Sequence, residues 1–410
     1  MRNLFICFLM GTVAYLLQQG PDPVREAATY LGILVVFPIL GARLFRNLGL
    51  PPAIGAIAAG AFLAQSGLLE ATTLQRVASF RDAAFVWIGL YIGSRIARVP
   101  TLRVPNITVA TTIVVSCSLL ICIATGFLPL TLLERLQIGF AGSICSPVFI
   151  SLEPNHHKDE IGLSGLTTAI ATLLLGATTL IHTYGESIIQ AQFLKTSGFC
   201  VLSLFITSEL AFRSLRCAAS GPGRYLVYIV TMGILWRYSA IVGIHPAVLG
   251  CFLGILLGFR TAQRQDLAQP LVETSTFVGS FVVGFVSAEI NWSHLGNAQS
   301  MAWAVAFLVV MPMVLGKVVS GIAAKHLTYT RPRLWLRTLP LGVAAMVILP
   351  SVIPARLFLG AITHSGEGVV PTLVLGTVCM PLTGIVMDRV SYYTESRRKT
   401  ASSSGSLELT

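Results

Sequence analysis

The chain of 410 residues is 54% hydrophobic and only 11% charged, with a formal net charge of +11 and a mean hydropathy of +0.78. This composition lies outside the range of water-soluble globular domains and indicates an integral membrane protein, which excludes a soluble enzyme, a nucleic-acid-binding protein and a disulfide-stabilised secreted domain. The eight cysteines form no Cys-x-x-Cys motif and lie mostly within apolar runs, so we expect neither a metal site nor a cofactor.

Residues 1–27 form a separate N-terminal segment. An apolar run from Leu4 to Leu17 follows Arg2, and its length of about 14 residues suits a signal-peptide core as well as a short helix. Because no small-x-small cleavage pattern follows this run, we favour a retained extra helix.

Residues 28–388 are predicted to form one all-α transmembrane domain of about thirteen helices. The expected spans are 28–45, 51–67, 83–97, 106–129, 133–152, 162–183, 197–213, 224–241, 244–259, 274–291, 301–324, 335–355 and 368–387. Residues 389–410 are rich in Ser, Thr and charge and are expected to form a disordered tail.

Positive charge is distributed unevenly between the predicted loops. If helix 28–45 begins outside, the inner loops and the tail hold nineteen Lys and Arg residues, whereas the outer loops hold five. Cytoplasmic loops carry the excess of Lys and Arg in membrane proteins, so this bias predicts a cytoplasmic C-terminus and accounts for the net charge.

Two stretches that lie 194 positions apart repeat one pattern. The letters "PAIG" begin at Pro52, and "PAVLG" begin at Pro246, each followed by a further glycine. In the predicted topology the first copy runs from inside to outside and the second from outside to inside, so the repeat is inverted.

A second pair of features recurs at nearly the same offset. Helices interrupted by proline and glycine are expected at Pro147, in "GSICSP", and at Pro340 and Gly342, in "RTLPLG". Inverted repeats with discontinuous helices that cross at the bilayer midplane are typical of secondary transporters. We therefore predict that residues 51–183 and 244–387 are inverted repeats.

From residue 28 onward the sequence resembles the monovalent cation:proton antiporters, the bacterial sodium/proton and potassium/proton exchangers with a thirteen-helix inverted-repeat fold. The stretches that carry the resemblance are "LFRNLGLPPAIGAIAAGAFLAQSGLL", "GSICSP", "GIHPAVLGCFLGILLG" and "VLGKVVSG". The resemblance implies a cation and a proton as substrates, a core that rocks against the rest of the protein, and a homodimer in the membrane.

The acids that serve this family are missing. In the family one or two carboxylates on the helix after the unwound one hold either a proton or the cation, but residues 161–182 contain no acid, and Thr172 lies near the expected position. Cys145 and Ser146 stand where the unwound helix often carries Asp. The hydroxyls of Ser143, Ser146, Thr168 and Thr172 are candidate cation ligands because hard cations prefer oxygen, although they cannot exchange protons near neutral pH.

Three further charges are candidate site residues. Lys317 lies deep in the span 301–324, where an unpaired ammonium is expensive, so we expect either a site role or a structural hydrogen bond to the crossed helices. Glu209 and Asp82 lie about one turn from predicted helix ends and are weak substitute carboxylates. The simpler explanation is that Glu209 pairs with Arg213 and Asp82 with Arg81.

The leading hypothesis is a multi-pass secondary transporter of the cell inner membrane that exchanges Na⁺ or K⁺ for H⁺ and is neither an enzyme nor a nucleic-acid-binding protein. Its expected partners are the cation, the proton, membrane lipid and a second copy of the chain. Because the core acids are missing, two alternatives remain: a transport-inactive scaffold or sensor, and a transporter of an anion or a neutral solute.

Overall fold

A computed structural model describes residues 22–48, 52–66, 71–98, 104–127, 130–143, 165–178 except 172 and 176, 191–218, 221–242, 245–261, 265–289, 311–312 and 315–316. The described residues are helical apart from short connections, with no strand among them, as the sequence predicts. Among them, the helices at 28–47, 107–124 and 266–289 are long and apolar enough to cross a bilayer.

The first half of the described chain contains α2 (Asp22–Asn47), α3 (Pro52–Gln65), α4 (Ala71–Arg98), α5 (Val104–Ala124), the 3-10 turn η2 (Thr125–Phe127) and α6 (Leu132–Ser143). Residues 165–171, 173–175 and 177–178 are also helical. The second half contains α9 (Ala191–Cys217), α10 (Gly221–Val242), α11 (Pro246–Thr261), the 3-10 turn η4 (Gln265–Ala268) and α12 (Gln269–Glu289). Only residues 311–312 and 315–316 are described in the last three predicted spans.

Local signals explain where several helices begin. Pro52 and Pro246 are the first residues of α3 and α11, where proline lacks only a donor that would have no partner within the helix. At α11, His245 completes the cap by accepting a hydrogen bond from the Ala247 N–H on its Nδ1, at 3.3 Å.

α6 begins with a reciprocal cap. The Thr131 hydroxyl oxygen accepts the Glu134 N–H at 3.3 Å, and the Glu134 carboxylate accepts the Thr131 N–H at 2.8 Å and its hydroxyl at 2.9 Å. Glu134 is therefore buried inside the first turn of α6 rather than exposed in a loop.

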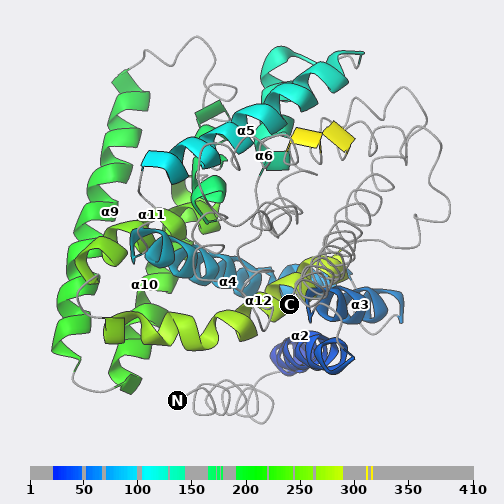
Figure 1. The fold of residues 1–410 in the computed structure, drawn as a ribbon. Helices are drawn as coiled ribbons and strands as arrows, with labels where there is room; N and C mark the ends of the chain where they lie inside the picture. The colour runs from blue at the N-terminus through cyan, green and yellow to red at the C-terminus, as the bar shows by residue number, and fades with distance from the viewer. Residues whose placement is uncertain are drawn as a thin grey trace, which may run out of the picture.

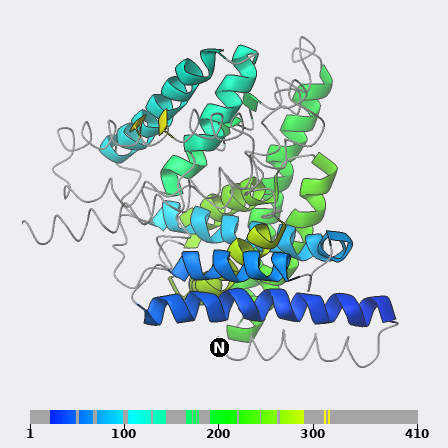
Figure 2. The same cartoon turned by 90° about the vertical axis from the view of Figure 1, so that its right-hand side faces the viewer.

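The helices form two groups (Figure 1). α2, α3, α4 and α12 pack against one another, and α11 packs along α4 and against α9 and α10. α5 and α6 pack against each other and form the second group. Figure 2 shows α2 and α3 lying side by side at the edge of the first group.

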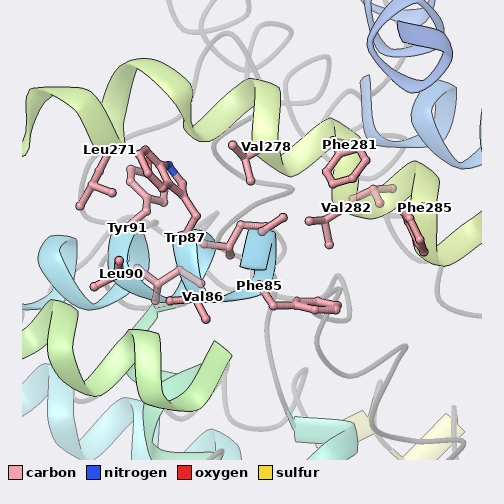
Figure 3. Close-up of a cluster of buried hydrophobic side chains, with 14 of the residues drawn as sticks. Phe85, Val86, Trp87, Leu90, Tyr91, Leu271, Val278, Phe281, Val282 and Phe285 are labelled. Carbon is pink, nitrogen blue, oxygen red and sulfur yellow. The ribbon is translucent and has the colours of Figure 1, made fainter. Parts of the chain in front are cut away.

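The buried core runs between α4 and α12. Figure 3 shows Trp87 of α4 directed toward α12, which contributes Leu271, Val278, Phe281, Val282 and Phe285, whereas Val86 and Leu90 lie on the side of α4 that faces α11. The Trp87 indole N–H donates to the Thr274 hydroxyl at 2.9 Å, and the Trp87 ring packs edge-on against Tyr228 of α10. One side chain thus links three helices.

Two helix crossings, α3 with α12 and α11 with α4, have the same geometry. Where α3 crosses α12, a Cβ on Gly60 would overlap the carbonyl oxygen of Gly284. Where α11 crosses α4, a Cβ on Gly254 would overlap the carbonyl oxygen of Leu90. Adding 194 to 60 gives 254, and subtracting 194 from 284 gives 90, so the two contacts are equivalent.

A second pair of contacts obeys the same rule. The Ser287 hydroxyl donates to the Ile57 carbonyl at 2.7 Å across α3 and α12, and Gly93 lies directly against the Cys251 carbonyl across α4 and α11. The same offset converts Ile57 into Cys251 and Ser287 into Gly93. Exchange of partners is what a two-fold axis produces, and the predicted topology places this axis in the membrane plane.

Candidate functional site

Two of the predicted site hydroxyls lie in described helices. Ser143 is the last residue of α6, is fully buried, and donates from its hydroxyl to the Phe140 carbonyl at 2.7 Å. Thr168 lies in the helical segment 165–171 with 7% of its surface exposed, and it also makes a polar or electrostatic contact. Both side chains therefore lie in the protein interior, where a ligand would have to compete with existing contacts.

The remaining predicted site residues lie outside the described residues. These are Cys145, Ser146, Thr172 and Lys317, together with the expected helix interruptions at Pro147, Pro340 and Gly342. Their roles stay predictions.

Two glycines that precede predicted site residues in the chain pack against α5. A Cβ on Gly139 of α6 would lie 2.8 Å from the Cα of Ser118, and a Cβ on Gly316 would lie 2.7 Å from the Cα of Cys117. Because glycine has no side chain, both neighbours approach the α5 backbone closely. The residue that immediately precedes Lys317 is therefore packed on the same turn of α5 that α6 contacts.

The segment that begins at Gly165 packs against α4 instead. A Cβ on Gly165 would lie 3.1 Å from Cγ1 of Ile96 and 3.4 Å from Cγ2 of Ile92. The described part of the helix that resembles the acid-bearing helix of the antiporters thus begins against the half of α4 that the charge bias predicts to be cytoplasmic.

Asp82, one of the two weak carboxylate candidates, belongs to an ion-pair cluster about three turns into α4. The Arg81 guanidinium lies 2.9 Å from the Asp82 carboxylate and also pairs with the Glu289 carboxylate at the end of α12. The guanidinium carbon lies 6.0 Å from the centre of the Phe285 ring, which adds a cation–π contact. The expected pair of Asp82 with Arg81 is therefore present, and Glu289 is an additional partner.

The other candidate, Glu209 on α9, is also ion-paired. Its carboxylate accepts from Arg213 one turn later at 2.8 Å and pairs with Arg260 at the end of α11. The side chain of Glu209 is 40% exposed. The expected pair of Glu209 with Arg213 is present, and the contact with Arg260 ties α9 to α11.

Further polar contacts join α10 to η4 and α12 at the end that the charge bias predicts to be cytoplasmic. The Tyr225 hydroxyl donates to the Glu273 carboxylate at 2.7 Å, and Arg224 pairs with Asp266 at 3.0 Å. The sequence alone places these acids only in loops or at loop edges. Their partners are 42 to 48 residues away in the chain, so no local signal indicates the pairing.

Among the described residues, no group of three or more His, Cys, Asp or Glu side chains could hold a metal ion. Three carboxylates lie near points where the chain is expected to leave the membrane, and each forms an ion pair with an arginine. They are Asp82, Glu209 and Glu289. The described residues thus form a close-packed, two-fold-related group of helices, α3, α4, α11 and α12, together with other helices that carry the buried hydroxyls of Ser143 and Thr168.

Comparisons with known proteins agree with this arrangement. The solved structure of the sodium proton antiporter MjNhaP1 from Methanocaldococcus jannaschii at pH 8 matches with a TM-score of 0.63 and 17% identity, covering 88% of this chain and 96% of that chain. An electron-microscopy map of the same antiporter matches with a TM-score of 0.62 and 15% identity, covering 88% and 94%.

Sequence comparisons add less. The model of the family described as "Transition state regulatory protein AbrB" matches residues 1–139, which is too little of the 410 residues to identify the family of the chain. No curated protein matches the sequence. The chain is an all-helical membrane protein with the fold of a sodium proton antiporter.

Proposed function

We propose that this chain is a secondary transporter of the cell inner membrane that exchanges Na⁺ or K⁺ for protons. The observation that carries the proposal is the exchange of partners between the α3–α12 and α4–α11 crossings, in a chain whose fold is similar to that of a sodium proton antiporter. Two-fold-related inverted repeats allow one site at the bilayer midplane to open alternately to either side.

In this proposal the crossings form the static part. At Gly60, Gly93 and Gly254, backbone meets backbone without intervening side chains, which leaves little room for sliding. The moving part is then the group that contains α5, α6 and the segment after Gly165. The cation would bind among the hydroxyls of Ser143, Ser146, Thr168 and Thr172 and the freed carbonyls near Pro147.

Proton coupling is the demanding step. No acid lies between residues 161 and 182, and the described carboxylates near the helix ends are paired with arginine. We therefore propose that Lys317, which lies deep in the predicted span 301–324, is the group that changes its protonation during transport.

The absence of an acid between residues 161 and 182 also favours two other functions. A core with Lys317 and without an acid suits an anion or a neutral solute better than a cation, and it also suits a chain that has lost transport and acts as a membrane scaffold or sensor. These possibilities share the fold and differ only in what crosses the membrane.

Purified protein in proteoliposomes separates the three possibilities. An imposed pH gradient should be dissipated when Na⁺ or K⁺ is added, and should persist in liposomes without protein. Movement of an anion or neutral solute without cation-dependent proton flux would show that the chain transports such a solute and does not exchange cations for protons. If protein that unfolds cooperatively on heating moves none of the cations, anions or neutral solutes tested, the scaffold or sensor function would be favoured.

Orientation and assembly belong to the same proposal. The charge bias supports a cytoplasmic C-terminus, and the resemblance supports a homodimer. A reporter fused to the C-terminus that is active only in the cytoplasm tests the first, and the mass of the protein in detergent tests the second.

A further inference from the structure

Arg237 interrupts an apolar stripe on the outer surface of α10. Leu226, Val230, Ile234 and Ile241 are 62%, 54%, 52% and 73% exposed, and their spacing places them on one face of the helix. Arg237 falls on the same face and is also exposed. Exposed side chains this apolar on a membrane protein face lipid, so a guanidinium stands among lipid-facing residues.

Arg237 differs from the arginines at the other end of α9, α10 and α11. Arg213, Arg224 and Arg260 each pair with a carboxylate. Within the part of the chain that the structure describes, Arg237 has no hydrogen bond, ion pair or ring contact. An uncompensated charge against lipid is expensive, so a counter-charge from outside the chain is expected.

The depth of Arg237 indicates where this counter-charge lies. The helix ends at Val242, five residues later, so the Cα of Arg237 lies roughly 7–8 Å below the end of α10. Its long side chain can extend over that distance to the headgroups. The neighbours Trp236 and Tyr238 are half-buried aromatic residues of the kind that gather at the membrane–water interface.

Positive charge near this end of α10 is not explained by topology, because the predicted orientation places it on the outer side. The two-fold relation supplies a comparison, since subtracting 194 from 237 gives Arg43, which is exposed near the end of α2. Arg43 faces the cytoplasmic side, where basic residues are expected. Arg237 is the equivalent residue on the outer side, where the charge bias gives no reason for a positive charge.

We propose that Arg237 binds the phosphate of an anionic lipid in the outer leaflet. A planar guanidinium matches two phosphate oxygens with parallel hydrogen bonds, and the apolar stripe from Leu226 to Ile234 offers a surface for the acyl chain. This binding requires neither cation transport nor the predicted core site, so it stands or falls independently of the proposed function.

The test measures lipid retention by purified protein in a neutral detergent. Native mass spectrometry follows the binding of phosphatidylglycerol and of zwitterionic phosphatidylcholine to the unmodified protein and to variants. The unmodified protein should prefer phosphatidylglycerol, and Arg237→Gln should weaken that binding about fivefold. Arg237→Lys should retain part of it, because lysine keeps the charge but not the paired geometry.

Arg213→Gln is the matched control, because it removes an exposed arginine whose guanidinium already pairs with Glu209. It should leave phosphatidylglycerol binding unchanged. Equal loss in both variants would mean that net charge, not a site, sets the affinity, and would overturn the proposal. So would equal affinity of the unmodified protein for the two lipids, or conversion of a dimer to a monomer by Arg237→Gln with lipid binding intact.

Discussion

Arg81 of α4 and Glu289 of α12 form an ion pair although 208 positions separate them in the chain. The Asp82 carboxylate pairs with the same guanidinium, so one arginine neutralises two carboxylates where the end of α12 meets α4. The side chains of Arg81 and Glu289 are 22% and 28% exposed, so water screens the pair only in part.

The first prediction concerns this cluster. Arg81→Gln should lower the free energy of unfolding by about 1–3 kcal/mol, because it leaves two half-buried carboxylates facing each other without a cation. Thermal unfolding in detergent measures the change. Glu289→Gln should cost less than Arg81→Gln, since Asp82 still holds the arginine. Additive effects in the double variant would contradict a direct contact.

The second prediction concerns the two helix crossings. Gly254→Ala should destabilise the protein by about 1–3 kcal/mol, because the added methyl group overlaps the Leu90 carbonyl and the backbones must separate. Gly60→Ala should cause a similar loss, since Gly60 is its two-fold equivalent.

Gly233 on α10 is the control for those variants. A methyl group added at Gly233 would meet no heavy atom within 4 Å, so Gly233→Ala should be neutral or stabilise α10 by up to about 1 kcal/mol. Equal melting temperatures for Gly254→Ala and Gly233→Ala would refute the close crossing of α4 and α11.

The third prediction concerns Glu209. Because its carboxylate already pairs with Arg213 and Arg260, Glu209→Gln should keep transport and lower stability by less than about 1 kcal/mol, as is usual for exposed ion pairs. Transport assays and thermal unfolding of the same preparation check both parts. Abolished transport in a stable variant would instead make Glu209 the missing carboxylate of the exchanger.

The sequence predicts some elements closely. The expected spans 51–67 and 244–259 correspond to α3 at 52–65 and α11 at 246–261, because a proline and an uncharged apolar run mark each helix. α4 starts at residue 71, twelve residues before the expected 83–97, because its first turns carry polar residues that a hydropathy criterion rejects.

The contacts could be predicted only where the pattern is local or repeated. Thr131 and Glu134 match the Ser/Thr-x-x-Glu signature of a helix start, which could have located the cap of α6. The pair of Arg81 and Glu289 has no such signature, because neither residue indicates the other along the chain. The offset of 194 is the exception, since a repeat in the sequence becomes an axis in the structure.

The fourth prediction concerns Lys317. If the ammonium serves transport, Lys317→Ala and Lys317→Gln should both abolish it while the protein remains folded. If Lys317 only donates hydrogen bonds to the crossed helices, Lys317→Gln should stay active and Lys317→Ala should melt at a lower temperature, because alanine leaves buried acceptors unsatisfied. Flux in proteoliposomes and thermal unfolding distinguish the two outcomes, and full activity with unchanged stability in both variants would exclude either role.

The fifth prediction restores the chemistry that the sequence lacks. Thr172 lies near the position at which the resembling antiporters carry an acid, on a helix whose described part packs against α4 through Gly165. A carboxylate there holds a proton or a cation but not both, so Thr172→Asp should create or increase Na⁺- or K⁺-dependent proton movement, and Thr172→Asn should not. The pH-gradient assay in proteoliposomes measures this directly, with the direction of the gradient reversed as an internal check. A silent Thr172→Asp variant that melts like the unmodified protein would show that the fold no longer supports exchange, and would favour a scaffold or a different solute.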